Sequence, residues 1–465
     1  MDALWIFLIG LVVVLGGILA LRLHAFLALI LGAYLVAALT SGDAIRQHGI
    51  SKKMTAEEAG KLAGEPAMQR VAREFGSTAG RIGILIALAT IVGKTLLESG
   101  GAERIVRTLL RVFGEKNAAG ALLTSGFLLG IPVFFDTVFF LMIPLAKALS
   151  LRTGRNYILY VLAIIAGGSM THSLVPPTPG PLFIASELQV NIGLMIAGGV
   201  VVGIGTAMSG WVFARWANRT YNIPLRETSP GSLAALQALA DRGEKDLPPF
   251  WLSATPIVLP VILITANALL NREGAGMLAT LGNPNVALAL SAFIGLGTLM
   301  WQGRERNEVF SKGVGRAIEE AGSIILITSA GGAFGGMLQQ SGIGPRLQEL
   351  SMAWPIGILP LAWGFTVLVR IAQGSSTVAM ITAVGAVGGM ATPEALGFHP
   401  LWVALAIGCG SKPIPWMNDS GFWVISKMSG FTEKECFATF SPMVSIMGTT
   451  GLFIVMILAK LFPLI

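Results

Sequence analysis

The sequence of residues 156–188 reads NYILYVLAIIAGGSMTHSLVPPTPGPLFIASEL. The run is apolar and long enough to cross a bilayer as a helix, because a crossing needs about 20 mostly apolar residues. Prolines and polar side chains between Ser169 and Gly180 interrupt the helix in the middle of the run. Irregular backbone at that depth is tolerated only where protein buries it or water reaches it, so the run predicts a broken membrane helix beside a polar site.

The whole chain has the composition of a membrane protein. It contains 465 residues, of which 54% are hydrophobic and 12% are charged, whereas a soluble domain carries about 25% charged residues. This composition excludes a soluble enzyme, a disordered chain and a secreted disulfide scaffold, and two cysteines are too few for a disulfide framework. The net charge of +7 comes from basic residues between apolar runs. It indicates loops that face anionic lipid rather than nucleic acid.

Apolar runs near the length of a crossing occur ten times. The first run follows Met1 without the basic region or cleavage site of a signal peptide, so we expect a retained helix there. The ten predicted crossings lie near residues 3–20, 23–42, 82–99, 156–188, 190–217, 250–270, 284–301, 321–340, 398–425 and 439–463.

Two further apolar spans, 118–150 and 355–392, break in the middle, at residues 130–132 and 373–376. The arms that remain are about 21–27 Å long as helices, mostly shorter than the bilayer core of about 30 Å. We therefore expect re-entrant hairpins that enter and leave on one side. Residues 43–81 carry mixed charges and predict an amphipathic arm at the membrane surface.

A short pattern occurs once in each half of the chain, 242 residues apart. Residues 93–105 and 335–347 share G-x-x-L-x-x-S-G-x-x-x-R-[IL], and the same offset carries one hairpin onto the other. Each half holds five predicted crossings, and since five is odd the second half must enter the membrane inverted. Inverted repeats with broken helices are the architecture of secondary transporters. The predicted fold is an all-α polytopic membrane protein with two inverted repeats, residues 1–217 and 249–465, joined by a linker at 218–248.

Lys and Arg residues in the short loops set the expected orientation. The basic cluster at 104–155, the segment from Arg215 to Lys245 and the loop from Arg304 to Arg316 fall on one side of the predicted crossings. We expect this side to be cytoplasmic, which leaves both termini facing the periplasm or the exterior.

Polar side chains gather at the four breaks in the apolar runs. Ionisable groups inside a membrane are rare and usually functional. Helix ends that converge there offer N–H groups and a positive dipole end to an anion. The four breaks carry Asp136 and Thr137; His172, Ser173 and Thr178; Arg370, Gln373, Ser375, Ser376 and Thr377; and Lys412, Asn418 and Asp419.

Each charged side chain at these breaks has two interpretations. Arg370 is a candidate ligand for a substrate carboxylate, because a guanidinium binds carboxylates through two parallel hydrogen bonds; it can instead pair with a carbonyl or an acid of the hairpin. Asp136 and Asp419 are candidate proton carriers or helix N-caps. His172 titrates near neutral pH and is a third candidate. Lys412 can snorkel or pair with Asp419.

Signatures of enzymes and of ATP-driven pumps are missing from the sequence. The four histidines lie far apart, without metal-ligand spacing, and no Walker-type G-x-x-x-x-G-K-[ST] occurs. The sequence therefore predicts neither a bound metal nor a cofactor. A membrane-embedded enzyme acting on a lipid-linked substrate is the less favoured alternative, because an inverted repeat argues against it.

Two motifs, His-x-x-x-Pro-Pro-x-Pro-Gly-Pro at 172–181 and Asn-Asp-x-Gly-Phe-Trp at 418–423, are distinctive. With them, nearly the whole chain resembles the gluconate permease (GntP) family of bacterial carboxylate–proton symporters. The resemblance implies the scaffold and elevator-type transport domains of the ion transporter superfamily, and substrates such as gluconate, other sugar acids, glycerate and D-serine. The family pattern has Glu where this chain has Asp136, His where it has Thr178, and Ser-His where it has Pro-Trp at 415–416.

We therefore expect a proton-coupled symporter of a small hydroxylated carboxylate in the bacterial cytoplasmic membrane, with a homodimer as its candidate assembly. Sodium coupling, D-serine and a dicarboxylate are the alternatives for the coupling ion and the substrate. The expected site lies between the hairpin tips and the broken crossings. Substrate contacts are expected from Arg370, Gln373, Ser375, Ser376, Thr377, His172, Ser173, Thr178, Asn418 and Thr137, and the proton is expected on Asp136, Asp419 or His172.

Overall fold

The computed structural model is helical, and its described residues form no strand. It describes residues 2–226, 247–270, 276–302, 307–343, 346, 357–388, 391 and 396–464. The first half contains α1 (Ala3–Leu19), α2 (Ala25–Leu39), α3 (Gly42–Ser51), α4 (Ala56–Gly64), α5 (Ala67–Glu98), α6 (Gly101–Phe113), a 3-10 turn (Glu115–Asn117), α7 (Ala118–Leu129), α8 (Phe135–Thr153), α9 (Tyr157–Leu174), α10 (Pro179–Glu187) and α11 (Ile192–Thr220). The second half contains α13 (Phe250–Leu270), α14 (Gly276–Leu281), α15 (Pro284–Gln302), α16 (Asn307–Gln340), α18 (Ile358–Gln373), α19 (Ser376–Val387), α21 (Leu401–Gly410), α22 (Ser420–Ser429), α23 (Glu433–Ala438) and α24 (Phe440–Leu461).

Seven helices within the described residues are apolar and long enough to cross a membrane. The architecture is that of a polytopic membrane protein, and it differs from the ten predicted crossings in three places. The first run forms the shorter helix α1. The second forms the fifteen-residue helix α2, after which the chain bends by 102° into α3, and the run at 398–425 forms two ten-residue helices, α21 and α22. The seven long helices are Ala67–Glu98, Tyr157–Glu187, Ile192–Thr220, Phe250–Leu270, Pro284–Gln302, Val314–Gln340 and Glu433–Leu461.

Proline interrupts both broken crossings. The pair Pro176–Pro177 separates α9 from α10, because proline lacks a backbone N–H and disfavours helical geometry in the residue before it. Residues 411–419 separate α21 from α22 and include Pro413 and Pro415. Both predicted breaks are therefore confirmed.

The two predicted hairpins are helix pairs, α7 with α8 and α18 with α19. α18 ends before Gly374, whose φ of +88° is left-handed, and a Cβ there would lie 2.2 Å from the Asn418 carbonyl oxygen. Both the backbone conformation and the close approach of the 411–419 stretch therefore require glycine. The Ser375 hydroxyl accepts a hydrogen bond from the backbone N–H of Val378 at 3.4 Å and caps α19.

The predicted surface arm at 43–81 is wrong in its second half. α3 and α4 lie in this region as short helices, but α5 runs unbroken through the rest of it into the following crossing. Arg70, in the charged part of α5, is buried and donates hydrogen bonds of 2.8 Å to the Gln340 side chain on α16 and to the Ala37 carbonyl oxygen on α2. Because both terminal nitrogens of the guanidinium have acceptors inside the protein, the charge does not keep the helix at the surface.

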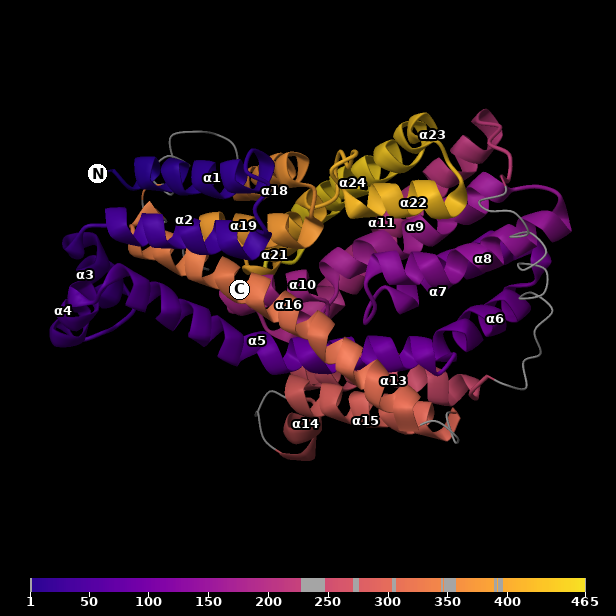
Figure 1. Cartoon of the computed structure of the whole chain (residues 1–465), viewed down its shortest axis with the longest axis horizontal. Helices are drawn as coiled ribbons and strands as arrows, with labels where there is room; N and C mark the ends of the chain where they lie inside the picture. The colour runs from indigo at the N-terminus through magenta and orange to yellow at the C-terminus, as the bar shows by residue number, and fades with distance from the viewer. Residues whose placement is uncertain are drawn as a thin grey trace.

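Figure 1 shows α5 and α16 crossing the molecule together, with α13 and α15 on one side of them. On the other side, 94% of an 18-residue apolar window within the crossing segment formed by α9 and α10 is buried in the protein. α8 packs against α22, and α19 packs against α10. These contacts bring the hairpin tips to the breaks in the two interrupted crossings.

The predicted linker at 218–248 is described only at its two ends. α11 continues to Thr220, and residues 227–246 lie outside the described residues. At the near end, Arg226 donates a hydrogen bond of 2.8 Å to the Gly430 carbonyl oxygen and forms an ion pair of 2.6 Å with Glu435. Through Arg226, the start of the linker therefore contacts the second half of the chain, at Gly430 and Glu435.

Candidate functional site

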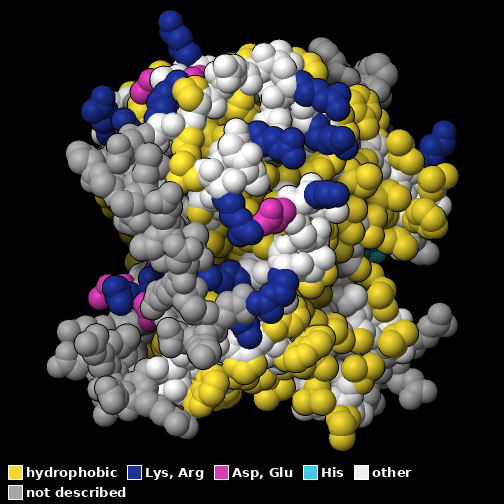
Figure 2. Space-filling view, turned by 90° about the vertical axis from the view of Figure 1, so that its right-hand side faces the viewer, with side chains coloured by type: hydrophobic (Ala, Val, Ile, Leu, Met, Phe, Trp, Pro, Cys, Tyr) yellow, Lys and Arg dark blue, Asp and Glu magenta, His cyan; other side chains and the backbone are white. Residues whose placement is uncertain are grey.

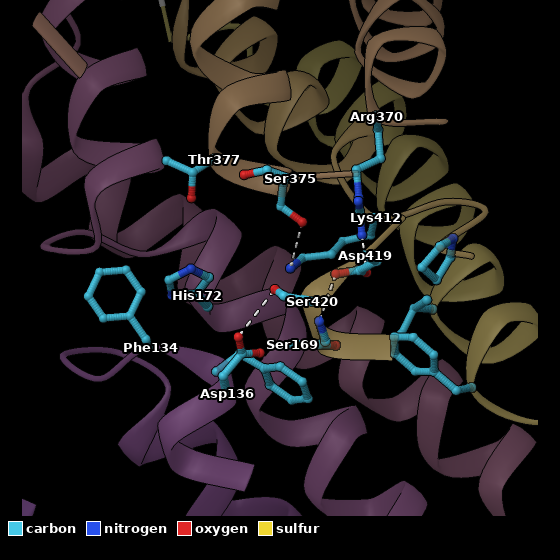
Figure 3. A pocket seen from close by; sticks show the side chains of 16 residues that line it. Phe134, Asp136, Ser169, His172, Arg370, Ser375, Thr377, Lys412, Asp419 and Ser420 are labelled. Carbon is cyan, nitrogen blue, oxygen red and sulfur yellow. Dashed lines mark hydrogen bonds and ion pairs between the residues drawn. The ribbon is translucent and has the colours of Figure 1, made fainter. Parts of the chain in front are cut away.

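A cavity of about 230 Å³ lies where the interrupted segments meet (Figure 3). Drug-sized ligands occupy pockets of about 300–1,000 Å³, so the smaller cavity suits a small metabolite. Sixteen residues line it: Phe134, Phe135, Asp136, Ser169, His172, Arg370, Ser375, Ser376, Thr377, Lys412, Pro415, Asp419, Ser420, Gly421, Phe440 and Val444. They come from both halves of the chain and include the starts of α8, α19 and α22.

Arg370 lies in the last turn of α18, where only 3% of it is exposed. Its Nε donates to the Ser411 carbonyl oxygen at 3.0 Å, and its Nη2 pairs with the Asp419 carboxylate. The remaining Nη1 is buried and has no hydrogen-bond partner among the described residues. A buried donor without an acceptor is unfavourable, so Nη1 retains a donor for which an anionic ligand would supply the acceptor.

Lys412 reaches the middle of the cavity from the irregular stretch before α22 (Figure 3). Its Nζ donates to the Ser376 hydroxyl at 3.5 Å. That hydroxyl donates to the Ser411 carbonyl oxygen at 3.0 Å, and the same oxygen accepts the hydrogen bond from Arg370. One carbonyl therefore connects the second hairpin tip to both cationic side chains.

The two carboxylates of the cavity lie at helix N-termini in different halves of the chain. Asp419 caps α22, with Oδ1 accepting from the Gly421 backbone N–H at 2.9 Å, while Oδ2 pairs with Arg370. Asp136, in the first turn of α8, accepts a hydrogen bond of 3.3 Å from the Ser420 hydroxyl. Both carboxylate oxygens of Asp419 are therefore engaged in contacts that hold the structure. For Asp136, the described residues show one such contact, from the Ser420 hydroxyl to Oδ2.

His172 and Ser169 lie one turn apart on α9 and line the opposite end of the cavity from Arg370 (Figure 3). Both are buried. The His172 Nδ1 and the Ser169 hydroxyl have no hydrogen-bond partner within the described part of the chain. The Phe134 ring lies 5.4 Å from the His172 ring, measured between centroids. This end therefore offers hydrogen bonds beside an apolar wall.

Some of the predicted site residues support the cavity without lining it. The Thr178 hydroxyl donates to the carbonyl oxygens of His172 and Val175, both at 2.8 Å, and so stabilises the break after α9. The Asn418 side chain donates to the Ile371 carbonyl oxygen at 2.9 Å and holds the end of α18. The predicted residues that do not line the cavity are Gln373, Ser173, Thr178, Asn418 and Thr137.

Other lining residues were not assigned a role from the sequence. Phe440 and Val444 lie one turn apart on α24, which the sequence predicts as an ordinary crossing, and no local pattern marks them. Ser420 directly follows Asp419, a predicted site residue, and this neighbourhood is the feature of the sequence that indicates a place for Ser420 at the cavity. The burial and central position of Lys412 exclude the snorkelling interpretation.

Comparison with known proteins places this arrangement in a family. A model of GntP family permeases matches residues 2–462, which include every cavity residue. The chain is 31% identical to a gluconate permease of Pseudomonas aeruginosa, over 99% of this chain and 97% of that protein. It is also 32% identical to an uncharacterized permease of Haemophilus influenzae, over 90% of this chain and 84% of that protein. The Gnt-II system L-idonate transporter of Escherichia coli is 31% identical, over 81% of this chain and 86% of that protein.

A solved structure supports the fold independently of sequence. The YdaH transporter of Alcanivorax borkumensis is similar with a TM-score of 0.62, over 85% of this chain and 88% of that chain, at 16% identity. Its likeness concerns the fold alone, while the family match and the permease relatives show that the chain is a membrane permease and not an enzyme. The protein belongs to the GntP permease family.

Proposed function

We propose that this permease is a secondary transporter that carries a small hydroxylated monocarboxylate together with a proton across the bacterial cytoplasmic membrane. The observation that carries the proposal is the buried, unpartnered Nη1 of Arg370 beside the cavity, as seen among the described residues. Relatives named for gluconate and for L-idonate support a sugar acid as the substrate.

The carboxylate end of the site is formed by Arg370 and three helix starts. α8, α19 and α22 each begin at the cavity, and their first turns point positive dipole ends and N–H groups at it. An anionic oxygen on Nη1 satisfies the donor that the protein leaves open. The tip hydroxyls of Ser375, Ser376 and Thr377 lie within the same lining.

The hydroxyl end of the site is formed by His172 and Ser169. Their unpartnered polar atoms provide an acceptor or a donor for substrate hydroxyls, while Phe134 packs against the carbon chain. A carboxylate without hydroxyls would leave these buried atoms unsatisfied, and sites of this kind discriminate strongly against such analogues. We therefore expect propionate or butyrate to bind far more weakly than glycerate or gluconate.

The proton is assigned first to Asp136. Asp419 is engaged by the α22 backbone and by Arg370, and its loss of charge would break both contacts. Asp136 faces one hydroxyl donor, Ser420, and can take up a proton with less rearrangement. His172 is the second candidate, because it lines the same cavity.

The contact between α5 and α16 supports the inverted repeat. Glu98 on α5 pairs with Arg316 on α16 at 3.3 Å. An offset of 242 residues relates Glu98 to Gln340 and Glu74 to Arg316, and all four positions lie on these two helices. The packing of α8 on α22 and of α10 on α19 exchanges in the same way. A pseudo-two-fold axis produces such pairs, and a transporter built on one moves one part against the other around a central site.

The charge distribution supports the proposed orientation. Figure 2 shows many Lys and Arg side chains and few acidic ones on the face at the right-hand end of Figure 1. α6, α8 and α11 end there, with exposed Arg111, Arg152 and Arg219 near their ends. The excess of positive charge favours this face as cytoplasmic. The N-terminus lies at the opposite end of the long axis (Figure 1).

Uptake into proteoliposomes tests the proposal. Radiolabelled gluconate or glycerate should accumulate when the outside is more acidic than the lumen, and a protonophore should abolish the accumulation. When a sodium gradient is imposed at equal pH on both sides, the substrate concentration in the lumen should rise only to the outside concentration. Accumulation driven by sodium alone would overturn the proton coupling, and absence of uptake for every hydroxy acid tested would overturn the substrate class.

A further inference from the structure

Lys412 has hydrogen-bonding capacity that the protein does not use. Its side chain is 8% exposed, and its ammonium group can donate three hydrogen bonds. Within the described residues its Nζ makes one hydrogen bond, to Ser376, at 3.5 Å, which is long for this bond type. A buried ammonium with spare donors beside a cavity indicates a ligand that is itself an acceptor.

Four other titratable or charged groups face Lys412, each from a different element. Asp136 comes from α8, Asp419 from the start of α22, Arg370 from the end of α18 and His172 from α9, and each is close enough to interact electrostatically with Lys412. Figure 3 shows the Lys412 amine between His172, Asp419 and the pair formed by Ser420 and Asp136.

Other charges on the packed helices are further away. Lys147 on α8 and Lys427 on α22 lie eleven and eight residues beyond the two aspartates. These separations correspond to about 16 and 12 Å along a helix. The charge balance of the cavity therefore depends on Arg370, Lys412, Asp136 and Asp419, with His172 as the neutral neighbour.

These four charges cancel when both aspartates are ionised and both Arg370 and Lys412 are protonated. A monocarboxylate that enters the cavity adds one negative charge, and an unbalanced charge in a desolvated site is strongly unfavourable. One proton on Asp136 restores neutrality. It also removes the attraction between Asp136 and Lys412, which frees the ammonium for the incoming carboxylate.

We propose that Lys412 binds the substrate carboxylate together with Nη1 of Arg370, and that its charge sets the coupling at one proton for each monocarboxylate. The loaded and the empty sites are then both neutral, so translocation moves no net charge. The hydrogen bonds that join Lys412, Ser376, the Ser411 carbonyl and Arg370 hold the two cations beside the same hairpin tip. This inference rests on the proposed function and adds the second ligand and the stoichiometry.

The electrical test uses the wild-type protein in proteoliposomes. Radiolabelled uptake under a fixed pH gradient is measured while potassium and valinomycin set the membrane potential, and substrate-induced current is recorded on a solid-supported membrane. We expect uptake rates that do not depend on the potential, and no current during uptake. A substrate-dependent current of either sign overturns the one-proton count while leaving the proposed function standing. Absence of carboxylate uptake under every condition overturns both.

The ligand role is tested with Lys412→Gln and Lys412→Arg, and Lys427→Gln on α22 is the matched control. Lys427 lies over the Trp423 ring at 5.7 Å and does not line the cavity. Removal of one charged hydrogen-bond donor should weaken gluconate binding about tenfold or more. Lys412→Arg keeps the charge and several N–H donors, so it should lose less affinity than Lys412→Gln, and the control should bind like the wild type.

Gluconate binding to Lys412→Gln at wild-type affinity would remove Lys412 from the site. A melting curve for each purified variant shows whether it is folded, and if Lys412→Gln does not fold, the wild-type electrical test still decides the stoichiometry. The variant His172→Gln distinguishes His172 from Asp136 as the proton carrier. If Asp136 carries the proton, this variant should still take up one proton with each substrate molecule. A count of zero protons in that variant would move the proton from Asp136 to His172 and overturn the charge balance proposed here.

Discussion

Replacement of Arg370 by lysine should weaken substrate binding sharply while leaving the protein folded. The charge of the site is unchanged by this substitution, so the effect isolates the geometry of the guanidinium. Arg370 uses Nε for the Ser411 carbonyl and Nη2 for Asp419, which leaves Nη1 for the substrate. A lysine has one nitrogen at the end of a flexible stem and cannot serve these three acceptors in fixed directions.

The magnitude follows from the loss of one charge-assisted hydrogen bond to the substrate. Such a bond is worth about 1.5–3 kcal/mol, which corresponds to about a 10- to 150-fold loss of affinity. The assay is equilibrium binding of radiolabelled gluconate to the purified protein, together with initial uptake rates in proteoliposomes. The melting temperature of the variant reports separately on the contacts with Ser411 and Asp419.

Arg316→Lys provides the matched control. Arg316 is 62% exposed and pairs with Glu98 at 3.3 Å, away from the cavity. An exposed pair of this kind contributes about 0–1 kcal/mol, so binding and uptake should be unchanged. Unchanged substrate affinity in Arg370→Lys, measured beside this control, would refute the assignment of Arg370 to the carboxylate.

Further predictions concern the proton, the hairpin turn, the break after α9 and the topology. Asp136→Asn and Asp419→Asn keep a hydrogen-bond acceptor but cannot titrate, and we expect Asp136→Asn to abolish pH-driven accumulation while substrate exchange persists; its loss in Asp419→Asn alone would move the proton to Asp419, and accumulation by both variants at the wild-type level would exclude these carboxylates as carriers. Gly374→Ala places a Cβ 2.2 Å from the Asn418 carbonyl oxygen at a φ of +88°, so it should destabilise the protein by about 1–3 kcal/mol or more in thermal unfolding, whereas Gly364→Ala, with no atom within 4 Å, should be neutral. Thr178→Val removes hydrogen bonds to two carbonyl oxygens and should lower the melting temperature more than Ser169→Ala, whose hydroxyl has no partner among the described residues; equal shifts would contradict the structural role of Thr178. Cysteines placed at residues 2 and 465 should react with an impermeant reagent in intact cells, and labelling only after permeabilisation would reverse the proposed orientation.

The membrane class and the breaks could be predicted from the sequence because local chemistry controls them. Long runs with few charges must be buried in lipid or protein, since a soluble surface needs more polar groups. The Pro176–Pro177 pair and the prolines of 411–419 interrupt their helices wherever those helices pack, because the limitation lies in the proline backbone itself. The turn at Gly374 follows from the same kind of local constraint.

The roles of individual side chains depended on the tertiary structure. Thr178 and Lys412 both lie at predicted breaks, yet the Thr178 hydroxyl turns back to its own segment while Lys412 extends into the cavity. The helical path of α5 through the predicted surface arm also needed its partners on α2 and α16, which bury Arg70 and accept hydrogen bonds from its two terminal nitrogens. The sequence pattern predicts where a helix ends, because the end of a helix depends on residues that are neighbours along the chain. The direction of a side chain, and whether a charge is satisfied, depend on segments more than two hundred residues away, such as Gln340 for Arg70, and only the packed structure brings them together.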